Sequence, residues 1–167
     1  MSDHPEAWLR GPVPGISPAL QPVAHALIQA REDVAAASQT MAAAIVWRKA
    51  GAASPGFHLL HLAGALDRLF TYARGDALTD SQKAEARAEG QEHPGLDAAA
   101  LNQHVSVAID RALDQLRATD PATLFEERRV GRTASSNAIG ILVHAAEHTA
   151  RHAGQFVSTV KILGAAS

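Results

Sequence analysis

The sequence predicts an all-α protein, a four-helix bundle with one long crossover connection. Three observations support this prediction: four long segments repeat apolar residues with a helical period, alanine is abundant while aromatic residues make up 4%, and most prolines and glycines fall outside the segments. Small side chains allow helix axes to approach closely. We expect residues 1–16 to form an irregular, proline-rich lead-in and residues 17–167 to form a single domain.

The first two long helices are predicted over residues 20–44 and 55–73. Trp47 is expected to cover the core face where the chain leaves the first of them. Ser54 suits the N-cap of the second helix, with Pro55 at its first position and Gly75 as its stop. The apolar residues of this second helix recur with a 3.6-residue period, at Leu59, Leu62, Leu66, Leu69 and Phe70.

Two more long helices are predicted after a polar connection. Residues 76–96 are polar and charged, and we expect them to hold a short exposed helix that Thr79 caps and that ends near Glu89. The third main helix is predicted over residues 97–118, and the last from Ser135 or Ser136 to about Leu163. The segment between them has mixed charge and a glycine, so we expect a short extended piece there.

The composition excludes several classes of function. The formal net charge of −2 and the lack of a basic patch argue against a nucleic-acid partner. The absence of cysteine removes disulfides, thiolate metal sites and a cysteine nucleophile. The first residues lack the pattern of a signal peptide, and no apolar run approaches the roughly 20 residues that span a bilayer. We therefore expect a cytoplasmic protein without a membrane partner.

Histidines carry the strongest functional signal. His144, His148 and His152 recur every fourth residue, and residues at that spacing lie on one face of a helix, about 6 Å apart along its axis. Two such imidazoles can reach one metal ion. His61, beside the apolar stripe of the second long helix, becomes the third ligand if the two helices pack face to face. We therefore predict a metal site of His61, His148 and His152, with solvated or core-packed histidines as the alternative.

Three neutral imidazoles leave a fourth coordination position for water or substrate, which is the composition of a catalytic site. A catalytic base is then needed, and the candidates are His144, Glu147 and His58. His144 drifts about 40° around the helix from His148, so we expect it to line the pocket. Glu147 faces about 100° away from His148, which favours solvation. Gln155 shares the face of the ligand pair and is a candidate to bond a ligand's second ring nitrogen.

Three further polar residues lie close to the predicted helix faces. His104 sits beside the apolar stripe of the third main helix, so we expect it to pack in the core. Arg68 and Arg74 are expected to form surface ion pairs, with a patch for an anionic substrate as the alternative.

Two segments together resemble the DinB/YfiT-like superfamily. The run LVHAAEHTARHAGQ resembles its C-terminal signature, a helix with H-x3-H followed closely by G-Q, and SPGFHLLHLAGALDRL resembles its second-helix motif. The resemblance covers essentially the whole chain. It implies a four-helix bundle with crossed connectivity and a divalent transition metal on His61, His148 and His152. Zinc and nickel are the foremost candidates, with iron, manganese and copper as alternatives.

The resemblance also implies a range of activities. Some members of the family are transferases or isomerases that use bacillithiol, mycothiol or glutathione, and others carry the label of metal-dependent hydrolases. Many form homodimers, so we expect a homodimer that acts on a small molecule, with a low-molecular-weight thiol as candidate cosubstrate. One departure is visible, because Ala153 stands where many relatives carry arginine.

Three hypotheses remain open. In the first, the protein is a metal-dependent enzyme, a thiol-dependent S-transferase or a hydrolase. In the second, it is a non-catalytic metal-binding or stress-response module, which predicts a closed coordination shell without a cavity beside the ion. In the third, the histidines are polar core residues of a helical dimer and no metal binds.

Overall fold

The computed structural model describes residues 5–51 and 53–165. Within these ranges the chain is mostly helical, with five α-helices and one antiparallel hairpin. The helices are α1 (Gln21–Thr40), α2 (Pro55–Ala73), α3 (Asp80–Ala88), α4 (Ala98–Ala118) and α5 (Ala138–Ala165), and the strands are β1 (Glu127–Val130) and β2 (Ala134–Asn137). This composition fits the all-α prediction.

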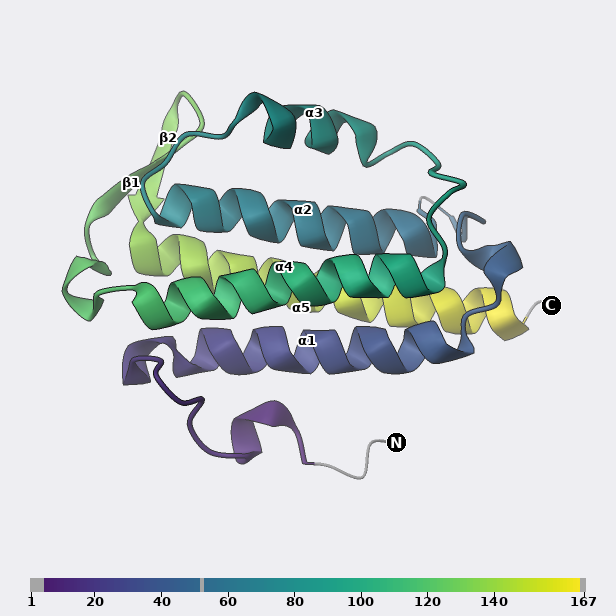
Figure 1. Ribbon diagram of the computed structural model, residues 1–167, viewed down its shortest axis with the longest axis horizontal. Coiled ribbons are helices and arrows are strands. Elements are labelled where there is room, and N and C mark those ends of the chain that lie inside the picture. The colour runs from purple at the N-terminus through teal and green to yellow at the C-terminus, as the bar shows by residue number, and fades with distance from the viewer. Residues whose placement is uncertain (1–4, 52, 166–167) are drawn as a thin grey trace.

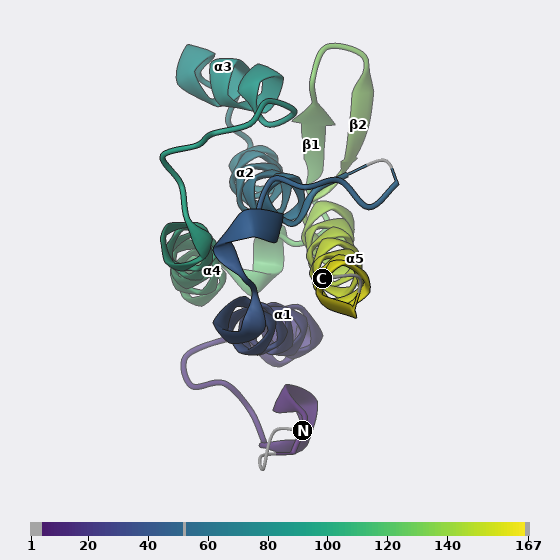
Figure 2. The ribbon, with the colours of Figure 1, turned by 90° about the vertical axis from the view of Figure 1, so that its right-hand side faces the viewer.

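Four long helices lie side by side, and the short helix α3 lies outside them, over α2 (Figure 1). Seen from one end, α1 is diagonally opposite α2, and α4 is diagonally opposite α5 (Figure 2). Helix α2 therefore packs against α4 and α5, and α1 packs against the same two helices. Because α1 and α2 occupy opposite corners, the connection between them crosses one end of the molecule. The arrangement sets α2 directly against α5.

The core lies between these four helices. Its largest fully buried side chains come from all of them and include Leu27 of α1, Leu59 and Leu66 of α2, Ile109 of α4 and Phe156 of α5. Burial of each such side chain contributes about 1.5–3 kcal/mol. Helix α2 has the bounds, the Ser54 cap and the apolar stripe that its sequence predicts, except that Leu69 is only partly buried. The packed core gives α2 and α5 a fixed relation to each other.

The first helix ends earlier than predicted. It stops at Thr40, and the backbone at Met41 is extended (ψ 113°). Alanine at positions 42–44 favours a helix, but the turn in the chain buries Met41, Ile45 and Val46 against the core. Tertiary packing outweighs helix propensity here. Trp47 then packs on the core as expected.

The two connections beside α4 also differ from their predictions. Thr79 and Gln82 form a capping box on α3, as the cap predicts, but Glu89, which follows this helix, is buried rather than exposed. The segment between α4 and α5 forms two paired strands instead of one extended piece, and it turns at Gly131 with a φ of 65°. None of the helices in the described ranges is long and apolar enough to cross a membrane.

Candidate metal centre

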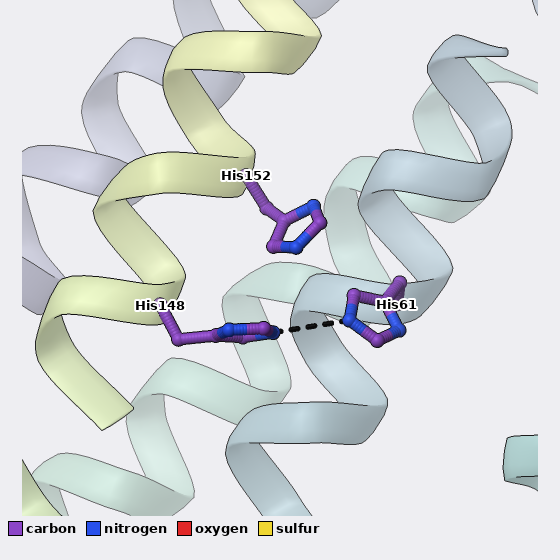
Figure 3. A group of neighbouring side chains, drawn as sticks. All are labelled: His61, His148 and His152. Atoms are coloured by element: carbon purple, nitrogen blue, oxygen red, sulfur yellow. Dashed lines mark hydrogen bonds between the residues drawn. The ribbon is translucent and has the colours of Figure 1, made fainter. Parts of the chain in front are cut away.

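His61 of α2 and His148 and His152 of α5 converge between the two helices (Figure 3). One ring nitrogen from each lies within 4.8 Å of those of the other two. The Nε2 atoms of His61 and His148 are 3.0 Å apart, and the ring centroids of His61 and His152 are 4.5 Å apart. The three side chains are half-buried. The cluster thus presents three nitrogen donors to one small volume.

The buried residues next to the two α5 histidines are small. Ala145, Thr149 and Ala153 are buried beside the two α5 histidines. On the other side, the ring of Phe57 stacks on His61 with a centroid distance of 5.4 Å and an interplanar angle of 10°. Since Ala153 is only 1% exposed, the position of the family arginine lies in the packed core of this chain. On α5 a cation, Arg151, directly precedes His152 instead.

A carboxylate fixes the orientation of His61. Oε2 of Glu89 accepts a hydrogen bond from Nδ1 of His61 over 2.8 Å, and Arg68 donates to the same carboxylate. With its proton on Nδ1, His61 carries its lone pair on Nε2, the atom that faces His148. Histidines that bind metals commonly donate their second ring nitrogen to a carboxylate in this way. The bond to Glu89 therefore prepares Nε2 of His61 as a ligand atom.

Gly64 makes room for this carboxylate. It lies one turn after His61 on α2, and a Cβ atom there would overlap Oε1 of Glu89 and lie 2.8 Å from Nη1 of Arg68. A glycine inside a helix costs about 1 kcal/mol relative to alanine. Here the glycine allows Glu89 to reach the surface of α2 beneath α3.

A fourth histidine supports His152. The Nδ1 atoms of His58 and His152 are 3.3 Å apart, so one of the two rings donates to the other. His58 is buried, with an exposure of 7%. This contact leaves Nε2 of His152 as its free ring nitrogen. His152 and His61 thus each hold one ring nitrogen in a hydrogen bond away from the cluster.

The environment favours neutral imidazoles. Burial, reinforced by the charges of His61, His148 and His58, lowers the pKa of His152 to about 4. Burial and His61 likewise lower the pKa of His148 and of His58. A neutral ring keeps the lone pair that a metal ligand needs. Burial alone would raise the pKa of Glu89, but hydrogen bonds from His61 and Arg68 outweigh it and lower the pKa, so the carboxylate stays ionised.

The other candidates from the sequence lie outside the cluster. The side chains of His144 and Glu147 are about half exposed, and they bond each other on the outer surface of α5. Gln155 is exposed and makes no hydrogen bond to a cluster histidine, while His58 takes the position beside His152. Of the three candidates for a catalytic base, only His58 therefore lies at the cluster, while His144 and Glu147 face solvent.

The three remaining polar residues have mixed outcomes. His104 is exposed, so the expectation of core packing is wrong, because its position on α4 lies just outside the buried stripe. Arg74 pairs with Asp76 at the surface, as expected. Arg68 instead pairs with the buried Glu89 beside the cluster.

Sequence reasoning missed Glu89 and Gly64. Nothing in the polar segment 76–96 distinguishes Glu89 from its acidic neighbours, since its burial depends on how that segment lies over α2. Gly64 did carry a signal, because a glycine inside an amphipathic helix often marks a close approach by another group.

The family model described as "DinB superfamily" matches residues 4–156, a range that contains all three cluster histidines. The protein therefore belongs to the DinB superfamily. No curated protein matches the chain.

Proposed function

We propose that His61, His148 and His152 hold one divalent transition metal ion and that the protein is a metal-dependent enzyme. The observation that carries the proposal is the approach of three imidazole nitrogens from two helices to within 4.8 Å of one another. Imidazole donors suit zinc or nickel, with iron, manganese and copper as alternatives. The proposal includes the four-helix-bundle topology of the DinB/YfiT type and a cytoplasmic homodimer.

The chain supplies three donors and leaves room for a reactant. An ion on three histidines would lower the pKa of a water or thiol that reaches its open position. Glu89 would hold His61 in the required tautomer, and His58 would do the same for His152. The protein residues thus orient the ligands, and the nucleophile comes from outside the chain, as either water for hydrolysis or a low-molecular-weight thiol for transfer.

A space beside the cluster favours an enzyme over a closed binding module. His58, in contact with His152, lines an open hollow of 560 Å³. A purely structural site is expected to have a closed shell of ligands. The hollow would place a small molecule beside His58, which contacts His152.

Elemental analysis tests the metal site. The protein is purified without a nickel column and compared with His61→Ala, His148→Ala and His152→Ala. We expect about one equivalent of a transition metal in the native protein and little in the three variants. His144→Ala is the matched control, because it removes an exposed histidine one turn from His148, and it should keep its metal. Absence of metal from the native protein, even after dialysis against Zn²⁺ or Ni²⁺, would overturn the proposal.

A second measurement separates the two reaction classes. Cobalt-loaded protein is titrated with glutathione while its absorption spectrum is recorded. A new charge-transfer band would support thiol-dependent transfer, and a spectrum that does not change would favour hydrolysis. Turnover of neither thiol conjugates nor ester and amide substrates would favour the non-catalytic module.

A further inference from the structure

The hollow beside the cluster has a lining rich in hydrogen-bond donors. Its polar side chains are His58, Arg151, Gln155, Ser158 and Thr159. The α5 members follow the spacing of one helix face. No aspartate or glutamate of the described chain lines it. The hollow is an open surface depression, and most of the α5 residues that line it are exposed.

Arg151 provides the positive charge of this lining. Its Nη2 atom bonds Oε1 of Glu147, which lies one turn earlier on α5. A guanidinium has five N–H donors, and the others of Arg151 have no hydrogen-bond partner among the described residues. Its side chain is 53% exposed. Arg151 can therefore bind an anion in the hollow while it keeps its contact with Glu147.

The position of the proton on His58 follows from its contact with His152. If Nε2 of His152 binds an ion, its Nδ1 keeps the proton and donates it to Nδ1 of His58. The proton of His58 must then lie on Nε2. No residue of the described chain accepts a hydrogen bond from that atom, and His58 lines the hollow. In that tautomer His58 offers an N–H donor at Nε2 rather than a basic nitrogen.

We propose that the hollow binds small carboxylates, with Arg151 receiving the carboxylate and His58 donating its Nε2–H to an oxygen of the same ligand. This inference names the substrate class of the proposed enzyme, and it rests on the proposed function for the tautomer of His58 and for the nearby ion. Neutral donors from Gln155, Ser158 and Thr159 complete a surface that matches oxygen acceptors.

Benzoate and benzamide are suitable probes, because they share a shape and differ in charge. Metal-free protein is titrated with each and followed by ¹H–¹⁵N NMR. We expect benzoate to shift the amide signals of residues 151–159 and benzamide to bind about tenfold more weakly. Arg151→Gln should weaken benzoate binding about tenfold, and Glu147→Gln should strengthen it by releasing Arg151. Arg129→Gln, which removes an exposed arginine from β1, should have no effect.

Equal binding of the two probes, or benzoate binding that persists in Arg151→Gln, would overturn the carboxylate pocket. Long-range ¹H–¹⁵N spectra, which observe the imidazole ring nitrogens, test His58 after Zn²⁺ is added. Its ring ¹⁵N shifts should report a proton on Nε2, and a proton on Nδ1 would overturn its role as donor. If Zn²⁺ does not bind, the proposed function and the role of His58 fail, while the benzoate titration still decides whether Arg151 binds carboxylates.

Discussion

Glu89 and Glu147 make the same kinds of contact in different surroundings. Each carboxylate bonds Nδ1 of one histidine and the guanidinium of one arginine: His61 and Arg68 for Glu89, His144 and Arg151 for Glu147. The side chain of Glu89 is 9% exposed and that of Glu147 is 50% exposed. Water screens the second group and competes for its hydrogen bonds. We therefore expect only the buried group to matter for ligand orientation and stability.

Glu89→Ala should have the largest effect. Without the carboxylate, His61 no longer has an acceptor for its Nδ1–H, and Arg68 loses its partner in a mostly buried position. We expect zinc affinity to fall about 10- to 100-fold and the free energy of unfolding to fall by about 2–3 kcal/mol. Competition with a zinc chelator and urea unfolding measure the two quantities.

Glu89→Gln distinguishes orientation from simple stability. The amide oxygen can still accept from Nδ1 of His61, so this variant should recover part of the zinc affinity that Glu89→Ala loses. Zinc affinity that is unchanged in Glu89→Ala would contradict a positioning role for this residue.

Gly64→Ala should disrupt the contacts among His61, Glu89 and Arg68 without replacing any of these three residues. The new methyl group would overlap Oε1 of Glu89 and displace the carboxylate from His61. We expect the free energy of unfolding to fall by about 1–2 kcal/mol and zinc affinity to weaken.

Gly154→Ala is the matched control, because nothing lies within 4 Å of a Cβ at that position of α5. There the gain in helix propensity should stabilise the protein by roughly 0.5–1 kcal/mol. If Gly64→Ala stabilised the protein as much as Gly154→Ala, Glu89 would not need the space above Gly64.

As the pH falls, protonation of the cluster histidines should destabilise the protein before protonation of Glu89 does. The pKa of His152 is about 4 in the folded protein, below its ordinary value of 6.5, so the unfolded chain binds more protons between these values. The pKa values of His58 and His148 shift in the same direction. The free energy of unfolding of metal-free protein should therefore fall as the pH drops from 6.5 towards 4.

The contribution of Glu89 to the free energy of unfolding is lost at a lower pH than that of the histidines. The pKa of Glu89 is lowered from 4.5, so its contribution is present above that pH and is lost only on further acidification. Urea unfolding at pH 7, 5.5 and 4.5 tests the order, with His152→Ala expected to show a shallower slope. A free energy of unfolding that stays constant from pH 7 to 5 would contradict the histidine contribution.

Glu147→Ala should have the smallest effect. Its exposed contacts with His144 and Arg151 are worth little, and we expect the free energy of unfolding to stay nearly unchanged. Zinc affinity should stay the same. A loss as large as that of Glu89→Ala would remove the distinction between the two groups.

The sequence predicts the long helices well because local signals define them. The proline and serine at the start of α2, the glycine after it and the 3.6-residue apolar period reproduce its bounds. The end of α1 was wrong by four residues, since burial of Ile45 and Val46 depends on distant helices. The same limit explains Glu89, whose burial depends on how a polar connection lies over α2. The drift of His144 around α5 set it apart from the cluster, but its exposure, instead of the expected place in the pocket, depends on where α2 lies.

The diagonal placement of consecutive helices has a consequence for biosynthesis. His61 and His148 are separated by 87 positions in the chain, and His58 and His152 by 94. Closing such long loops requires most of the fold, so the cluster is assembled late rather than nucleated locally. A nascent chain that still lacks α5 carries His61 alone, and it gains its full donor set only when synthesis is nearly finished. Metal capture would then report that folding of the whole domain is complete.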